Sequence, residues 1–402
     1  MLLLCLTAGG CVSFNPQPES KTEFKDRIKS QAHNSIRVSA AVLEDDEAAA
    51  VYGVALARLG VRAIWLEIEN NTPQKLHLLP SSLDQNFFSH NEAAYRFHTV
   101  FRPDLNRRIT EHFRALAIRQ EIEPGGRKAG YLLVNRHRGG RHLPVELLDH
   151  KSLRRFDFFF PLPDGTFDYE DVPIEHLYQD TGVRELAHDA FSTWAEALPC
   201  CASNADGSHF GDPVNVLVIA ESDVLLGALA RNGWAFTEHT RPKTVLESVR
   251  SMLLGNPEFH FPVSSLYYFG RHQDLAMQRP RGSIPQRNHM RIWRAPASYE
   301  GRSVWAIQLS RDIGIKPTWH SPFLLTHVID PEVDEDRAYF LELLLRSQSI
   351  KTWGYVDGVG ESTQEAPARN LTGDPYLTDG RRLVIELSEQ PVAINASRFV
   401  EW

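Results

Sequence analysis

The chain has 402 residues, of which 42% are hydrophobic and 23% are charged, and its formal net charge is −8. This length suits two or three domains, and the composition is that of a folded globular protein. A nucleic-acid-binding protein usually carries a basic surplus or a basic stripe. Neither is visible here, so we expect no nucleic-acid partner. No uninterrupted apolar run reaches the roughly 18 residues that a membrane-spanning helix needs.

The N-terminus has a short hydrophobic stretch at residues 2–8, which is at the lower size limit for the core of an export signal. It ends in the run Ala8, Gly9, Gly10 and Cys11. This run resembles the lipobox of bacterial lipoproteins, in which the cysteine thiol carries diacylglycerol. It departs from that pattern at Ala8, where leucine is favoured, and in having no charged residue before Glu19.

We therefore predict a signal peptide over residues 1–11, lipid attachment at Cys11 and a polar tether over residues 12–35. Acyl chains bury CH₂ groups at about 0.8 kcal/mol each, so a multiply acylated cysteine anchors a chain to a membrane. Residue 12 is not Asp. In enteric lipoproteins, a residue other than Asp at this position favours delivery to the outer membrane over retention in the inner membrane. The expected location is the periplasmic side of a bacterial membrane. The alternative is a frayed apolar N-terminus on a soluble protein.

Residues 36–163 have the pattern of a domain of short strands separated by turns. Apolar residues alternate over residues 36–42 and 64–68, as in half-buried strands, and residues 76–79 could pair back as a hairpin. Further strands are expected at residues 131–134 and 156–160. A helix capped by Asp104 interrupts them, with Leu105, Ile109, Phe113 and Leu116 on one face. We predict an all-β sandwich of immunoglobulin-like type with a helical insertion near residues 84–118.

Residues 182–400 combine helices with strands, so we predict an α+β domain. Helices are expected from residue 186 to Pro199, from Ser222 or Asp223 to Gly233, around residues 245–253, and from Asp330, which would act as the cap. Strands are expected at residues 214–218, 266–269, 289–293, 304–309 and 323–329, around residue 355, and at residues 383–387.

Several motifs in this second region resemble the LssY C-terminal domain family, over about residues 186–390. They lie at residues 198–201, 211–216, 233–234, 268–276, 289–293 and 326–334, in the family's order. The chain departs from the family at Arg279, where Lys is common, and at Val328, where a second His is common. A paired His would favour a metal site, so its absence weakens one. The resemblance implies no particular reaction, because the family's activity is unassigned.

His289, Arg291 and Trp293 alternate along one predicted strand, so their side chains should share one face. Arg can clamp a phosphate or carboxylate, and Trp can stack on a sugar, which suits an anionic lipid or glycan ligand. The alternative is a sheet face covered by the chain's own loops. A ligand-facing Arg291 would add little to stability, whereas a structural one would neutralise a buried carboxylate such as Asp274.

Other motif residues allow both a functional and a structural interpretation. His327 and Asp330 follow a predicted strand, where His327 could act as a base; alternatively, His327 is buried and Asp330 caps the helix. Arg271 and Asp274 lie in a loop, where they could contact a ligand or pair with each other. A metal site of His289, His327 and either Asp312 or Asp330 is conceivable, but spacing alone fixes no ligand set, so we predict neither a metal nor a cofactor.

The adjacent residues Cys200 and Cys201 could form a vicinal disulfide in an oxidising compartment or remain a buried thiol pair. For the whole chain, we expect a membrane-anchored envelope lipoprotein that acts as a binding or accessory module. The alternative is an envelope hydrolase that acts on a phosphorylated lipid or glycan, with its site at His289, Arg291 and His327. The sequence leaves open whether the chain is an enzyme.

Overall fold

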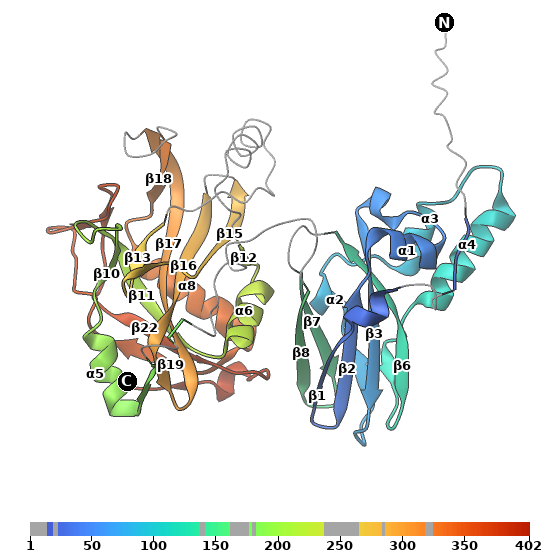
Figure 1. Ribbon diagram of the computed structural model, residues 1–402, viewed down its shortest axis with the longest axis horizontal. Helices are drawn as coiled ribbons and strands as arrows, with labels where there is room; N and C mark the ends of the chain where they lie inside the picture. Colours follow the sequence, from blue (N-terminus) through green and yellow to red (C-terminus); the bar gives the residue numbers. More distant parts are fainter. Residues whose placement is uncertain are drawn as a thin grey trace, which may run out of the picture. The chain divides into compact units, whose positions relative to one another are not determined.

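The structure is a computed structural model of two compact units, Met1–Asp164 and Gly165–Trp402 (Figure 1). It describes residues 14–18, 23–136, 141–160, 177–178, 182–236, 265–283, 286–317 and 325–402. Strands predominate over helices in this part of the chain. The helix predicted around residues 245–253 lies outside the described residues. Within the described ranges, no helix is long and apolar enough to cross a membrane.

The first unit contains two four-stranded antiparallel sheets. One has the order β1 (Lys29–His33), β2 (Ile36–Val42), β3 (Val61–Asn70) and β6 (Arg127–Asn135). The other has the order β5 (Glu121–Ile122), β4 (Leu76–Leu78), β7 (Arg141–Leu148) and β8 (Leu153–Phe160). Alternate residues of both sheets, among them Val38, Leu66 and Val145, are buried in one shared core. Period-two alternation therefore gives each sheet one apolar face, and the two faces cover each other.

Helices lie against the other face of the β3-containing sheet. They are η2 (Glu23–Arg27), α1 (Asp45–Tyr52), η3 (Leu56–Leu59), α3 (His90–Tyr95) and α4 (Pro103–Leu116); a further short helix is α2 (Pro80–Leu83). Tyr52, Phe113 and Tyr131 meet there in a second core. The predicted helical insertion contains α3 and α4. However, α4 has Arg102 at its N-cap and Pro103 in its first turn, so Asp104 is not the cap as predicted.

Two further predictions for the first unit are wrong. The strand β4 does not pair back onto β3 but joins β5 and β7, because buried Asn70 redirects the chain by donating to carbonyls of Gln74 and Ile122. The described residues 23–35 of the predicted tether are not a free linker but pack on the unit: β1 pairs with β2, and Phe24 is fully buried. The strand β1 was not predicted, because its polar sequence has no apolar alternation.

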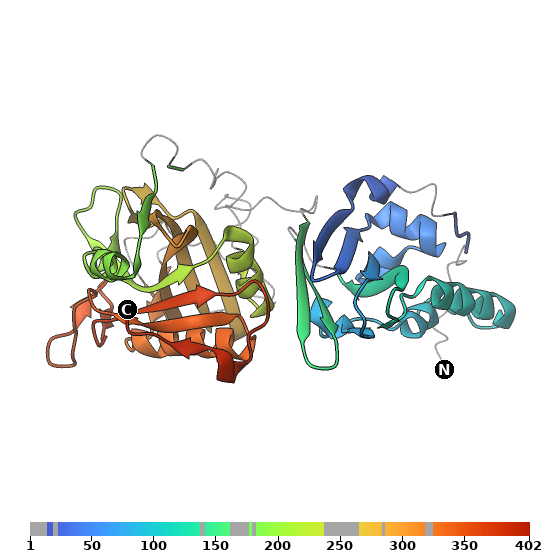
Figure 2. The same cartoon turned by 90° about the horizontal axis from the view of Figure 1, so that it is seen from below.

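The second unit is built around a curved, branched sheet with thirteen strands in the described residues (Figure 1, Figure 2). Its main path runs β12 (Ala235–Phe236), β15 (Leu275–Ser283), β16 (Gln286–Tyr299), β17 (Arg302–Pro317), β11 (Phe210–Ile219), β10 (Cys201–Ser203), β13 (Tyr267–Tyr268) and β14 (Arg271–His272). The strands β9 (Arg184–Leu186), β18 (Leu325–Ile329), β19 (Ile350–Val356), β22 (Arg382–Leu387) and β23 (Arg398–Phe399) branch from it, and β20 (Ala368–Arg369) pairs separately with β21 (Pro375–Tyr376).

The sheet forks at β17. One edge of β17 pairs with β16, whereas the other pairs first with β11, as far as Gln308, and then with β18, from Asp312 onward. Ser310 therefore lies where β17 changes partners. The two faces of the sheet are covered by separate cores: α6 (Ser222–Arg231) and α8 (Val333–Arg346) pack on one, and α5 (His188–Glu196) packs on the other.

The helix α8 begins later than predicted. Its N-cap is Glu332, not Asp330. The backbone N–H of Asp330 still donates to the carbonyl of Arg311 on β17, at 2.8 Å, so the strand pairing extends past the end of β18. Asp330 instead accepts a hydrogen bond from the backbone of Glu332.

Arg382 is fully buried and joins three segments of the second unit. Its guanidinium donates to the carbonyls of Ala195, Leu198 and Pro199 at the end of α5, and to Val214 on β11, over 2.7–3.0 Å. The C-terminus of a helix carries partial negative charge, so a cation is favoured there. Arg382 therefore fixes the chain on which Cys200 and Cys201 lie.

Replacement of this buried guanidinium tests that structural role. Arg382→Met should lower the free energy of unfolding by about 3–5 kcal/mol, because four carbonyls lose a charged donor. Equilibrium urea unfolding measures the change. The exposed Arg398 is the matched control, and Arg398→Met should stay within about 0.5 kcal/mol of the parent. Equal midpoints for both variants would contradict the assigned role.

Candidate functional site

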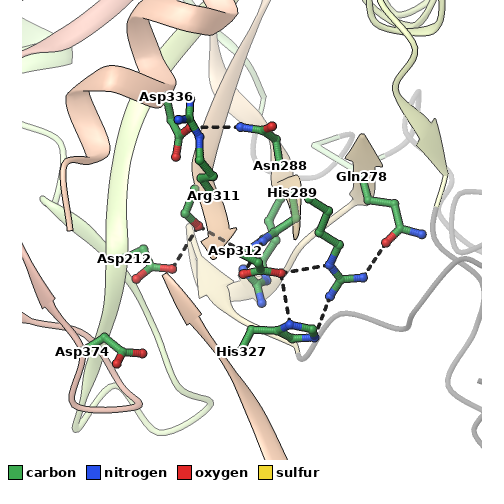
Figure 3. A network of polar contacts seen from close by, with 12 residues as sticks. Asp212, Gln278, Asn288, His289, Arg311, Asp312, His327, Asp336 and Asp374 are labelled. Carbon is green, nitrogen blue, oxygen red and sulfur yellow. Dashed lines mark hydrogen bonds and ion pairs between the residues drawn. The ribbon is translucent and has the colours of Figure 1, made fainter. Parts of the chain in front are cut away.

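Polar side chains gather on one face of the second unit's sheet, at the fork of β17 (Figure 3). We call this set the polar face; it consists of Asp212, Gln278, Arg287, His289, Arg291, Gln308, Ser310, Asp312 and His327. Residues two apart on a strand point to the same side, which is why β16 and β17 each supply three members. The intervening residues Met290 and Leu309 point into the core beside α6 and α8.

Asp312 is the centre of the polar face and is fully buried. Its carboxylate accepts a hydrogen bond from Nε of Arg287 at 2.9 Å and lies 3.2 Å from Nδ1 of His289. Nδ1 of His327, on β18, lies 3.5 Å away. Arg287 also donates to Gln278, and its NH2 lies 3.2 Å from Nε2 of His327. Two strands, β16 and β18, thus supply cationic or N–H groups to one carboxylate.

The electrostatics of this centre keep Asp312 ionised. Burial alone would raise the pKa of Asp312, but His289, His327 and Arg287 together outweigh burial and hold this pKa well below its ordinary value. Burial, Arg287 and His289 lower the pKa of His327 to about 4, against the opposing pull of Asp312. At neutral pH the His327 ring is therefore uncharged, and its Nε2 can accept from Arg287.

A second arm of the network runs from His289 to β11. Nε2 of His289 lies 3.1 Å from Oγ of Ser310, which donates to Asp212 at 3.2 Å. Gln308 donates to Ser310 at 2.7 Å and accepts from Arg291 at 2.6 Å. Asp212 and Asp312 thereby balance Arg287 and Arg291. The polar face therefore contains equal numbers of Arg and Asp.

Arg291 is 5% exposed, so the prediction of an exposed, ligand-facing Arg is wrong. Burial lowers the pKa of Arg291 to about 10, while the charges of Asp212 and Asp312 act in the opposite direction. The carboxylates that interact with this guanidinium are therefore Asp212 and Asp312. Asp274, the partner suggested from sequence, is paired elsewhere.

Trp293 shares the face of His289 and Arg291 but cannot serve as a stacking platform, because it is fully buried. Its ring packs 5.7 Å from that of Tyr268, and its Nε1 donates to the carbonyl of Arg271 at 3.3 Å. The polar residues on this face of β16 therefore end at Arg291, and Trp293 belongs to the apolar core beside α5. Alternation along the strand gave the correct face but not its burial.

Arg271 and Asp274 pair with each other, by two hydrogen bonds of 2.9 and 2.6 Å. Asp274 also accepts from the backbone of Arg294, and Arg271 donates to the hydroxyl of Tyr178. These contacts favour the structural alternative for the loop. In the described part of the chain, the structure brings His289, Arg291 and His327 into one network, while Arg271, Asp274 and Asp330 form their hydrogen bonds elsewhere.

A separate group of three polar residues lies on the opposite face, beneath α8. Asn288 donates to Asp336 at 2.9 Å, and Nε of Arg311 lies 2.7 Å from the same oxygen (Figure 3). Burial raises the pKa of Asp336 to about 6, against the charge of Arg311 and with a contribution from Asp330. These three residues attach α8 to β16 and β17, behind the polar face.

Cys200 and Cys201 are joined by a disulfide, and Sγ of Cys201 lies 3.4 Å from the hydroxyl of Tyr376. Among the residues that the structure describes, no three His, Cys, Asp or Glu side chains are placed to hold a metal ion. At Asp312, the guanidinium of Arg287 donates to the carboxylate at 2.9 Å.

Sequence reasoning missed most of the polar face, including Asp212, Gln278, Arg287, Gln308 and Ser310, and it considered Asp312 only for a metal. A usable signal existed for three of them. Arg287 stands two residues before His289, and Ser310 and Asp312 would have appeared on the same face if the strand predicted over residues 304–309 had been extended. Asp212 and Gln278 are far from the motif histidines in sequence, and only strand pairing brings them close.

The contacts of Arg291 lead to a stability prediction. Arg291→Met should destabilise the protein by about 3–5 kcal/mol, because Asp212 and Asp312 remain buried without this cation. Adding Asp212→Asn should recover part of the loss, since the double variant removes both charges. Urea unfolding of the two single variants and the double variant gives the coupling energy. An Arg291→Met protein as stable as the parent would contradict the structural role.

Comparison with known proteins gives a family match in the unit that carries the polar face. Residues 195–381 match the model of a family described as LssY C-terminus, inside the range that the sequence motifs predicted. No curated protein matches the chain. Residues 195–381, in the second unit of this chain, therefore belong to the LssY C-terminus family.

Proposed function

We propose that the chain is a membrane-anchored envelope lipoprotein whose LssY unit binds an anionic group of a phosphorylated lipid or glycan. The binding point is the Arg287–His327 end of the polar face. One observation carries this proposal: the His327 side chain is 29% exposed, whereas the Arg287 beside it is almost fully buried. His327 thus forms the solvent-facing end of a network that reaches Asp312.

The chemistry of this end suits an oxyanion. Arg287 now has a neutral imidazole nitrogen 3.2 Å from its NH2. An oxyanion in place of that nitrogen would give a hydrogen bond in which both donor and acceptor are charged, with the two-point geometry that a guanidinium offers to phosphate or carboxylate. Its negative charge would also favour the protonated form of His327, which would then donate a second hydrogen bond. Binding and protonation of His327 are therefore coupled.

This coupling predicts a pH dependence for the binding of inorganic sulfate, whose charge is constant between pH 5 and 8. The bound anion should raise the pKa of His327 above its free value of about 4. Affinity should therefore rise as pH falls through the bound pKa, with protons taken up on binding. Titration calorimetry in two buffers of different ionisation enthalpy measures both quantities. His327→Gln should remove the pH dependence, and pH-independent affinity in the parent would contradict the proposal.

The alternative is an envelope hydrolase, which one specific observation favours. Ser310, His289 and Asp312 stand in the order of nucleophile, base and orienting carboxylate, with contacts of 3.1 and 3.2 Å. Ser310 is fully buried and donates to Asp212, so attack on a substrate would first require its exposure. In the sulfate experiment, the same protein is also given p-nitrophenyl phosphate. Turnover that Ser310→Ala abolishes would favour the hydrolase over the binding module.

The lipid anchor is proposed from the run at residues 8–11, which resembles a lipobox. It would hold the protein on the periplasmic side of a membrane, the outer rather than the inner. We predict that Cys11→Ala leaves the membrane fraction and loses palmitate label, because this thiol carries the acyl chains. Cys5→Ala, within the same signal, is the matched control and should retain both. Membrane retention without label would mean a different anchor.

For the first unit we propose an immunoglobulin-like sandwich that spaces or presents the LssY unit. The strand pairing supports this proposal: β3 pairs with β6 in one sheet, and β4, β7 and β8 are neighbours in the other. This is the relation of strands B and E to strands C, F and G in immunoglobulin domains.

A further inference from the structure

The last residue of α3 and the loop that joins α3 to α4 expose large apolar side chains. Tyr95 is 73% exposed, Val100 is 77% exposed and Phe101 is 95% exposed. We call residues 95–102 the α3–α4 tip. Single exposed apolar residues are common on protein surfaces, but a group of them within one loop marks an interaction site.

The tip is held in place by its own polar contacts. The side chain of Asn106, on α4, accepts from the backbone N–H of Thr99 and donates to the Thr99 carbonyl, both at 2.9 Å. Nε2 of His98 lies 3.0 Å from the hydroxyl of Thr110. Phe101 has φ = 68°, a conformation that bulky residues rarely adopt. The loop thus presents an aromatic ring to solvent in a conformation that costs free energy.

The surroundings of the tip are basic, in contrast to the net charge of −8 for the chain. Residues 95–108 contain four Arg and one acidic residue, Asp104, which pairs with Arg107 at 2.8 Å. Arg102, Arg107 and Arg108 are exposed. Basic residues contribute about 1 kcal/mol each to attraction by anionic lipids, and aromatic side chains insert at the headgroup level. The combination matches the surface of an anionic bilayer.

The chain segment that leads to Cys11 also lies on α4. The ring of Phe14 packs 5.6 Å from that of His112, and the guanidinium of Arg108 lies 5.7 Å from the centre of the Phe14 ring. Phe14 is three residues from Cys11, a span of roughly 10 Å when extended. A lipid attached at Cys11 would therefore enter a membrane close to the helix that carries the tip.

We propose that the α3–α4 tip docks on an anionic membrane surface, with Phe101 and Val100 inserted among the headgroups. Only the argument from the position of Cys11 rests on the proposed lipoprotein function. The exposure, the backbone conformation and the basic surroundings of the tip stand without it. A lipidated chain would then have two membrane contacts, one covalent and one formed by the folded surface.

The test uses full-length Cys11→Ser protein, which has no acylation site at residue 11, and vesicles of three parts phosphatidylethanolamine to one part phosphatidylglycerol. Co-sedimentation should detect binding that weakens from 50 to 500 mM NaCl, with little binding to phosphatidylcholine vesicles. Phe101→Asn should reduce the vesicle affinity about tenfold, because the inserted ring is lost. Asn tolerates a positive φ, so this variant should fold. Phe210→Asn, at a residue 60% exposed in the other unit, is the matched control.

Equal binding by the parent and Phe101→Asn, or no binding by the parent, would overturn the docking proposal. If Phe101→Asn instead abolishes self-association measured by analytical ultracentrifugation, while vesicle binding is absent, the tip is a protein interface. Failure of palmitate labelling at Cys11 would refute the lipid anchor but leave this result unaffected, because the vesicle experiment uses protein without that anchor.

Discussion

The carboxylate of Asp312 is removed from water at the place where β17 changes its strand partner. An isolated buried carboxylate is very costly, so the strands around it must supply compensating groups. Arg287 and His289 come from β16 and His327 from β18. The fork makes room for these groups around Asp312, because β11 and β18, the successive partners of β17 on its second edge, diverge there.

This constraint extends to the rest of the polar face. His289 contacts Ser310, which donates to Asp212, and Gln308 links Ser310 to Arg291. Replacing such a network by apolar residues of similar volume is often neutral or stabilising, so its presence calls for a reason beyond stability. All its members lie within residues 195–381, the range that matches the LssY C-terminus family. We interpret the network as the scaffold that holds Arg287 and His327 ready for an anion.

The sequence predicted the elements better than it predicted their burial. Apolar alternation located β2, β3, β11 and β16, because period-two patterns follow directly from strand geometry. The same alternation could not distinguish a solvent-facing row of His289 and Arg291 from a buried one. The charges that neutralise Arg291, on Asp212 and Asp312, come from strands that only long-range pairing brings together. The polar strand β1 carried no apolar signal, which is why residues 12–35 were predicted to be a tether.

The proposed anion site depends most directly on the electrostatic state of His327. In the proposed network, burial and the guanidinium of Arg287 keep this ring neutral, although Asp312 is close. Nitrogen-15 NMR of histidine-labelled protein, with His327→Gln for assignment, follows the ring nitrogens of His327 as pH is lowered. The account predicts one protonated nitrogen, Nδ1, at pH 7 and titration near pH 4. Titration near 6.5, the value of a histidine in water, would show that His327 is not part of a buried network around Asp312.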